Sequence, residues 1–181
     1  KNKSKIVCLT AYSKSIASIL DKFVDIILVG DSMANVLYGH KNTHKISLKN
    51  ILQHTSSVKM GVNNSLLVVD MPKGSYQNIK IAHKNVKLVI NKTKCDAIKL
   101  ESNGKNYKII ESLVKKKIPV MGHIGYTPQF KRNFKIEGTS KLDGLKLLKE
   151  AKAIEKAGAF SIVLECISPR TAKLITRELD I

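Results

Sequence analysis

Acidic residues, arginine and tryptophan are all scarce in this sequence. Its 181 residues include 14 acidic side chains against 32 lysines and arginines, only three of the 32 are arginine, and tryptophan is absent. Specific readers of nucleic-acid bases and phosphates depend on the fixed fork of arginine, so this composition argues against that class. We therefore interpret the net charge of +18 as a lysine-coated surface. A basic nucleic-acid-binding protein, whose binding depends strongly on salt, is kept as a weaker alternative.

Cysteine pairs, long apolar runs and glycine-rich loops are missing as well. The three cysteines, Cys8, Cys95 and Cys166, form no CxxC pair, which argues against a disulfide framework or a zinc site. No apolar run is long enough to cross a membrane, and no signal-peptide pattern opens the sequence. Neither GxGxxG nor GxxxxGK[ST] occurs, which argues against dinucleotide-binding and P-loop folds. We expect a soluble, cytoplasmic protein.

What the sequence does contain is a series of short apolar runs. With 43% hydrophobic residues, the chain can bury one full core. Continuous apolar runs of this length are typical of parallel strands covered on both faces. Segments of helical periodicity separate them, which indicates a repeating β-α pattern and a parallel sheet. The predicted strands are IVCLT (6–10), IILVG (26–30), LLVVD (66–70), AIKLE (97–101), PVMGH (119–123) and SIVLE (161–165).

This pattern predicts an α/β fold of the (β/α)8 barrel, or TIM barrel, type. A complete barrel has eight strands, whereas six are recognised in this sequence. We therefore expect a single barrel domain over residues 1–181 that is truncated at its C-terminus. The periodicity predicts four helices. The first is Ser15–Phe23, with Ile16, Ile19, Leu20 and Phe23 on one apolar face that we expect to be buried, and the others are Lys105–Lys117, Leu142–Ala157 and one capped by Ser168 that ends near Leu179.

The few acidic residues are concentrated at the ends of the predicted strands. Asp31, Asp70, Glu101 and Glu165 each end an apolar run, and burying a carboxylate is costly unless something pairs with it. The C-terminal ends of barrel strands meet at one mouth, where functional groups gather. Asp31, Asp70 and Glu101 offer only oxygen donors, which suit Mg²⁺. Any one of these acids could instead cap a helix or pair with a lysine, but three in one sheet register favour a metal site.

Four side chains near strand ends are candidates for binding and catalysis. Lys99 precedes Glu101 by two residues, so both face the same side of the strand. Lys99 could bind a substrate carboxylate or form a Schiff base, with an ion pair to Glu101 as the alternative. Ser32 could donate a hydrogen bond to a bound anion or cap a helix. His123 could contact substrate or be a buried core residue, and Glu165 is the candidate general base.

Several motifs resemble those of the ketopantoate hydroxymethyltransferase family. In chain order they are KIVCLTAY, ILVGDS, VVDMPKGSY, IKLES, PVMGHIGYTPQ, FKIEG and AKAIEKAGAFSIVLEC. HIGYTPQ and GAFSIVLEC together are highly specific, and the matches cover nearly the whole chain. The resemblance implies a barrel related to the phosphoenolpyruvate mutase and isocitrate lyase group.

The resemblance also implies an activity and its requirements. The family transfers a hydroxymethyl group from 5,10-methylenetetrahydrofolate to 3-methyl-2-oxobutanoate, which gives 2-dehydropantoate on the route to pantothenate and coenzyme A. It implies Mg²⁺ as the metal, the folate as co-substrate, and self-association into a homo-oligomer, a decamer. The roles that it implies are Asp31, Asp70 and Glu101 as metal ligands, Ser32, Asp70, Lys99 and His123 as substrate-binding residues, and Glu165 as the catalytic base.

A related Mg²⁺-dependent barrel that makes or breaks carbon–carbon bonds in 2-oxo acids without folate is the main alternative. Such relatives carry a cysteine near a KKC-like stretch, whereas this sequence has HIGYTPQ in the corresponding region. This difference favours the transferase. A non-catalytic remnant is a further alternative, because only six strands of a barrel are recognised.

Overall fold

The computed structural model of the protein describes residues 5–181. The chain forms two compact units, the first ending at Lys99 and the second beginning at Leu100. Strand order in the sheet follows chain order, β1-β2-β3-β4-β5-β6. Among the described residues, no helix is both long enough and apolar enough to cross a membrane.

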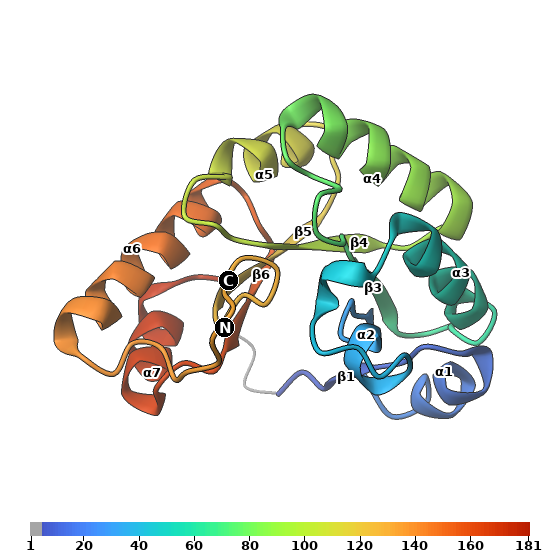
Figure 1. Ribbon diagram of the computed structural model, residues 1–181, viewed down its shortest axis with the longest axis horizontal. Coiled ribbons are helices and arrows are strands. Elements are labelled where there is room, and N and C mark those ends of the chain that lie inside the picture. Colours follow the sequence, from blue (N-terminus) through green and yellow to red (C-terminus); the bar gives the residue numbers. More distant parts are fainter. Residues whose placement is uncertain (1–4) are drawn as a thin grey trace. The chain divides into compact units, whose positions relative to one another are not determined.

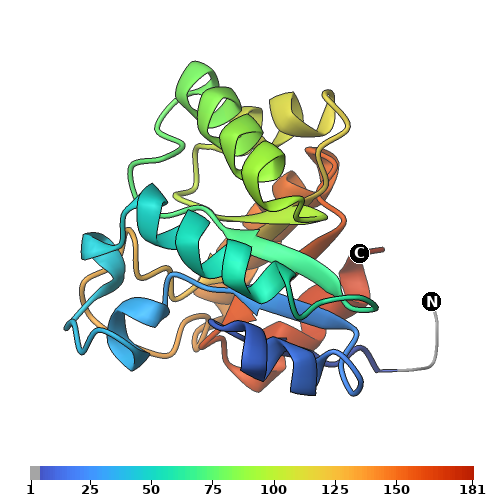
Figure 2. The ribbon, with the colours of Figure 1, turned by 90° about the vertical axis from the view of Figure 1, so that its right-hand side faces the viewer.

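The first unit alternates strands with helices. Its strands are β1 (Cys8–Thr10), β2 (Ile26–Val29), β3 (Leu66–Asp70) and the first part of β4 (Ala97–Glu101), and each pairs with the next in parallel. Its helices are α1 (Lys14–Leu20), α2 (Met33–Val36), the 3₁₀ turn η1 (Thr43–Lys45), α3 (Leu48–Lys59) and α4 (Ile79–Thr93). Helix α3 packs between α1 and α4 (Figures 1 and 2).

The second unit continues the same alternation. After the end of β4 come α5 (Tyr107–Val114), β5 (Val120–Gly125), α6 (Lys141–Lys156), β6 (Ser161–Glu165) and α7 (Pro169–Glu178). Strands β5 and β6 pair in parallel, with His123 opposite Val163 and Gly125 opposite Glu165. Helix α6 packs against both α5 and α7 (Figure 1).

Local side-chain chemistry explains where several helices begin. Ser47 and Asn50 form a capping box at the start of α3, and the Asn78 side chain accepts from the third residue of α4. The Ser140 hydroxyl oxygen accepts from the Asp143 backbone N–H at the start of α6. Each of these side chains satisfies a backbone N–H that has no partner within its own helix. Gly158 follows α6 with a φ of +92°, a conformation that glycine adopts without strain.

All six predicted strands are confirmed, and β3, β4 and β6 have the predicted bounds. The expectation that every strand is buried on both faces is wrong for β1, all three of whose residues are exposed. Within the described chain β1 pairs only with β2, so it is an edge strand. By contrast, every residue of β4 and β5 is buried.

Helix α1 differs from the expectation. The predicted helix reached Phe23, which lies beyond the end of α1 and is 74% exposed. Ile16 and Ile19, predicted for the buried face, are 48% and 59% exposed, and Ala17 is buried in their place. The side of α1 that carries Ala17 is the buried one, and α1 packs against α3. The chain just after α3 also lies close to α1, since a Cβ on Gly61 would lie 2.5 Å from the Lys14 carbonyl oxygen.

The other predicted helices are confirmed with shorter or shifted ends as α5, α6 and α7. Ser168 occupies the N-cap position of α7, but in the described structure its side chain makes no capping hydrogen bond. Its hydroxyl donates to the carbonyl oxygen of Gly138 instead, and so does that of Thr171. These two bonds fasten the loop before α6 to the start of α7.

Candidate active site

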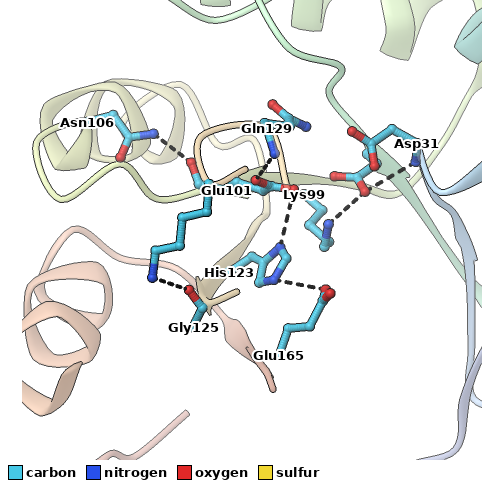
Figure 3. A network of polar contacts seen from close by, with 10 residues as sticks. Asp31, Lys99, Glu101, Asn106, His123, Gly125, Gln129 and Glu165 are labelled. Carbon is cyan, nitrogen blue, oxygen red and sulfur yellow. Dashed lines mark hydrogen bonds and ion pairs between the residues drawn. The ribbon is translucent and has the colours of Figure 1, made fainter. Parts of the chain in front are cut away.

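A buried ion pair lies at the carboxyl end of the first unit's strands. The sheet register places Asp70 on β3 directly opposite Lys99 on β4. The Lys99 Nζ donates to Oδ2 of Asp70 at 2.6 Å, and the backbone N–H of Asp31, just after β2, points to the same oxygen at 3.4 Å (Figure 3). All three residues are buried. The structure therefore brings together Asp31, Asp70 and Lys99 as the sequence predicted.

The partner of Lys99 decides between its proposed roles. The sequence left Glu101 open as an ion-pair partner, but the ion pair that the structure forms is with Asp70. An ammonium group bound to a carboxylate is a hydrogen-bond donor, whereas a Schiff base requires the free amine. This geometry favours binding of an anionic oxygen over covalent catalysis.

The two carboxylates fit a hard divalent cation. Among the described contacts, Oδ1 of Asp70 is buried and has no hydrogen-bond partner, and an oxygen in that state costs free energy unless something binds it. No group of three or more His, Cys, Asp or Glu side chains is arranged for a metal within residues 5–181. Mg²⁺ needs only one or two carboxylates, because waters and substrate oxygens complete its shell. Asp31 and Asp70 therefore fit Mg²⁺.

Ser32 takes part in a side-chain contact that the sequence did not reveal. It precedes α2, yet in the described structure its side chain makes no capping hydrogen bond, so the capping alternative is wrong. Its Oγ lies 2.8 Å from the phenol oxygen of Tyr12. Tyr12 follows β1 in the TAY stretch, and that strand-end position was the one indication of a site role.

The second unit holds a histidine between two carboxylates. His123 on β5 places Nδ1 3.8 Å from Oε1 of Glu101 and Nε2 3.2 Å from Oε2 of Glu165 (Figure 3). The side chains of His123 and Glu101 are 1% exposed, while that of Glu165 is 39% exposed. Glu165 thus combines contact with a buried imidazole and access from outside, which a general base requires.

Glu101 is oriented by the segment that follows β5. The backbone N–H of Gln129 donates to its Oε2 at 3.0 Å, and the Asn106 side chain donates to its carbonyl oxygen at 2.9 Å. Gln129 is fully buried and belongs to the HIGYTPQ stretch. The sequence did not indicate this role of Gln129, because the group that contacts Glu101 is a backbone N–H and does not depend on the type of side chain.

The ends of β5 and β6 approach too closely for any side chain at Gly125. Its φ is +94°, and a Cβ there would overlap the carbonyl oxygen of Glu165. That oxygen accepts from the Tyr126 N–H at 2.8 Å, while the carbonyl of Gly125 accepts from Lys131 Nζ at 2.8 Å. These contacts fix the backbone from which the Glu165 side chain projects.

Two groups near Glu165 have raised pKa values. Burial raises the pKa of the Tyr126 phenol, and the Glu165 and Glu101 carboxylates raise it further. Burial and the Glu165 carboxylate likewise raise the pKa of the Cys166 thiol. Both groups therefore stay protonated near neutral pH, and neither is a nucleophile.

The predicted residues thus fall into two groups. Asp31, Ser32, Asp70 and Lys99 lie in the first unit, and Glu101, His123 and Glu165 lie in the second. In the first unit the Lys99 side chain and the Asp31 backbone N–H meet Asp70, while Ser32 contacts Tyr12. In the second unit His123 lies between Glu101 and Glu165. Every one of them lies at or just beyond the carboxyl half of a strand.

Comparison with known proteins agrees with these features. The family model described as ketopantoate hydroxymethyltransferase matches residues 1–181. The 3-methyl-2-oxobutanoate hydroxymethyltransferase of Pelagibacter ubique (strain HTCC1062) is 51% identical over 181 residues, which are all of this chain and 70% of the relative. The enzyme of that name from Clostridium botulinum (strain Alaska E43 / Type E3) is 43% identical over 187 residues, covering all of this chain and 68% of the relative.

Solved structures identify the fold. A 2,3-dimethylmalate lyase, described as a PEP mutase/isocitrate lyase superfamily member, superposes with a TM-score of 0.73 at 14% identity, covering 99% of this chain and 63% of that one. A phosphonopyruvate hydrolase in complex with oxalate and Mg²⁺ gives 0.72 at 14% identity, covering 96% and 63%. The predicted α/β class is confirmed, and the parallel strands described here have the fold of part of a TIM-type barrel. With its whole length matched by the family model, the chain belongs to the ketopantoate hydroxymethyltransferase family.

Proposed function

We propose that the protein transfers a hydroxymethyl group from 5,10-methylenetetrahydrofolate to 3-methyl-2-oxobutanoate and forms 2-dehydropantoate for pantothenate synthesis. Over the whole reaction one C3–H bond and the two C–N bonds to the folate methylene break. One C–C bond forms, and one water supplies the new hydroxyl group, so that tetrahydrofolate is released. The observation that carries this proposal is the contact between buried His123 and accessible Glu165 in a chain of this family.

The first unit supplies the groups for binding a 2-oxo acid. Asp31 and Asp70 would hold Mg²⁺. Glu101, which lies in the second unit, is a further oxygen ligand only by what the family resemblance implies. When bound, Mg²⁺ supplies Lewis-acid stabilisation of the negative charge that develops on the keto oxygen. Lys99 and Ser32 donate hydrogen bonds to the substrate's carboxylate or keto oxygen. Because Lys99 is already positioned by Asp70 at 2.6 Å, binding requires little reordering of its long side chain.

The second unit supplies the proton transfer. Glu165 removes the proton from C3 of the oxo acid, leaving an enolate whose carbon attacks the methylene group of the folate. The family resemblance implies that His123 binds the substrate's oxygens. Its Nε2 lies 3.2 Å from Oε2 of Glu165, so the imidazole is adjacent to the proposed base. Positioned acid–base groups of this kind accelerate proton transfer by about 10²- to 10⁴-fold.

A folate-independent lyase or mutase acting on 2-oxo acids is the second candidate. The fold neighbours favour it, since they include a 2,3-dimethylmalate lyase and a phosphonopyruvate hydrolase solved with oxalate and Mg²⁺. Both candidates form an enolate, so they differ in the fate of that enolate. Incubation with 3-methyl-2-oxobutanoate and Mg²⁺ separates them, because 2-dehydropantoate forms only when 5,10-methylenetetrahydrofolate is added.

The enolising half-reaction is the most direct test. In D₂O with Mg²⁺, exchange of the C3 proton of 3-methyl-2-oxobutanoate is followed by NMR without folate. We expect exchange that EDTA abolishes and that Glu165→Gln slows by about 10²-fold or more. Glu111→Gln, on the exposed face of α5, is the matched control and should exchange at the unaltered rate. Absence of exchange in a folded, Mg²⁺-loaded chain would overturn the mechanism.

The assembly and location of the protein belong to the same proposal. The family resemblance implies a homo-oligomer, a decamer, and the cytoplasmic location is our expectation from the sequence. Light scattering coupled to size exclusion measures the mass directly, and a monomer at micromolar concentration would contradict this part of the proposal.

A further inference from the structure

Tyr12 contacts Ser32 in a way that the proposed chemistry has not yet used. The two hydroxyl oxygens lie 2.8 Å apart, although the residues are 20 positions apart in the chain and come from different strand ends. Both side chains are half-buried. Either hydroxyl can donate in this bond, so the direction of donation determines what Ser32 can do for a ligand.

The chemistry of the two hydroxyl groups favours donation by Tyr12. A phenol, with a pKa near 10, is a much stronger acid than an aliphatic alcohol and is therefore the better donor. When Tyr12 donates, the single hydrogen of the Ser32 hydroxyl remains available for an anionic oxygen. Consecutive hydrogen bonds of this kind polarise one another, which strengthens the outer bond.

The backbone of Tyr12 is fixed from the opposite side. Nδ1 of His54, on α3, lies 2.7 Å from the Tyr12 carbonyl oxygen, which can only accept. His54 therefore carries a proton on Nδ1. Its Nε2 lies 2.8 Å from the phenol oxygen of Tyr38, which follows α2. The contacts thus connect Tyr38 with His54, His54 with Tyr12, and Tyr12 with Ser32 at the candidate substrate site.

Gly30 leaves room for the Ser32 hydroxyl. A Cβ on Gly30 would lie 2.8 Å from Ser32 Oγ and 3.8 Å from the Tyr12 phenol oxygen. Real Cβ atoms do not approach an oxygen that closely, so any side chain at position 30 would displace the hydroxyl. The glycine and Tyr12 therefore restrict the same serine rotamer from two directions.

We propose that Tyr12 is a positioning residue that directs the Ser32 hydroxyl toward the anionic oxygens of a bound 2-oxo acid. This inference rests on the proposed function for the identity of the ligand. It goes further because it assigns part of the affinity for the substrate to Tyr12. Tyr12 acts through Ser32 and does not itself take part in proton transfer.

The test uses Tyr12→Phe, which removes the hydroxyl and keeps the ring. We expect the Kd of 3-methyl-2-oxobutanoate, measured by calorimetry with Mg²⁺, to rise roughly three- to tenfold, the usual effect of one lost hydrogen bond. The KM for C3 exchange should rise in parallel while kcat changes little, because uniform binding is lost. In a Ser32→Ala background, Tyr12→Phe should cause no further change.

Two further variants separate positioning from general damage. Gly30→Ala keeps the Tyr12 and Ser32 hydroxyls but displaces Ser32 Oγ, so it should also raise the Kd of the oxo acid. In the Ser32→Ala background, Gly30→Ala should leave the Kd unchanged. Tyr107→Phe is the matched control, because that half-buried phenol interacts with the Ser102 side chain in the second unit. It should leave the Kd unchanged.

The outcomes distinguish this inference from the proposed function. Equal affinity in Tyr12→Phe and the unaltered chain, or an additive loss in the Ser32→Ala background, overturns the role of Tyr12. If the unaltered chain binds the oxo acid but does not exchange its proton, the proposed function fails and the Kd values still decide the role of Tyr12. If the unaltered chain binds no oxo acid, both fail.

Discussion

Nε2 of His123 lies 3.2 Å from Oε2 of Glu165 across the parallel pair β5–β6. The register places His123 opposite Val163 and Gly125 opposite Glu165, so the imidazole and the carboxylate project from nearby positions on adjacent strands. The imidazole is buried, while part of the carboxylate is exposed. One oxygen of Glu165 therefore lies against the buried imidazole, while the exposed part of the carboxylate is open to a substrate.

Replacing His123 tests the importance of that contact. His123→Phe retains a ring of similar size but removes both nitrogens, so Glu165 loses its partner and we expect C3 exchange to slow by about 10²-fold. His123→Gln, whose amide can still donate to a carboxylate, should recover part of the rate. His83→Phe on α4 provides a matched control outside this cluster. Unaltered exchange in His123→Phe would show that Glu165 needs no partner.

Gly125→Ala tests the close approach of β5 to β6. The new Cβ would overlap the Glu165 carbonyl oxygen at a φ of +94°, so we expect overpacking of about 1–3 kcal/mol in addition to the conformational cost. Gly104→Ala carries the conformational cost alone, about 1–2 kcal/mol, since within the described structure nothing lies within 4 Å of a Cβ there. Urea unfolding of both variants isolates the steric part. Equal destabilisation would contradict the proposed overlap.

Asp70→Asn tests the fit to Mg²⁺ without measuring activity. Binding of a ligand to the folded state alone stabilises it by about 1.4 kcal/mol when the ligand is at ten times its Kd. We therefore expect MgCl₂ to raise the melting temperature of the unaltered chain above that in NaCl of equal ionic strength. Asp70→Asn should abolish this increment. Asp96→Asn, which alters an exposed carboxylate bonded to the Leu67 N–H at the other end of β3, should preserve it.

The sequence predicted the strands well because apolar runs between turn residues have few alternative structures. It also placed the candidate residues at strand ends, and the structure confirms those positions. The partner of Lys99 could not be predicted in the same way. Alternation along one strand suggested Glu101, whereas the register between β3 and β4 places Asp70 opposite Lys99, and register is a property of two strands.

The residues that were missed act over long sequence distances or through the backbone. Tyr12 reaches Ser32 only after two strands pair, and Gln129 contributes a backbone N–H to Glu101. The face of α1 was misjudged for a related reason, since a period of 3.6 residues shows which side chains share a face but not which face is covered. The covering element is α3, whose contact with α1 is a tertiary feature.

Asp21 fastens the end of α1 to the loop before β3. Its carboxylate accepts from the backbone N–H groups of Asn63, Asn64 and Ser65 at 2.9–3.1 Å. Burial alone would raise the pKa of this carboxyl group. The hydrogen bonds from those three N–H groups outweigh it and lower the pKa from 3.8 to about 2. The folded state therefore favours the ionised carboxylate.

The sign of that shift gives a pH dependence of stability. A group whose pKa is lowered by folding stabilises the protein above its unfolded pKa, here 3.8, and loses that contribution as the pH falls toward about 2. We expect Asp21→Asn to lower the unfolding free energy at pH 7 by about 1.5–3 kcal/mol, the usual range for hydrogen bonds to a charged group. Urea unfolding at several pH values should show this difference shrinking below pH 4. Asp180→Asn, an exposed control near the end of the chain, should show no such trend. A difference that is as large at pH 2.5 as at pH 7 would mean that the loop is held by the shape of the side chain and not by its charge.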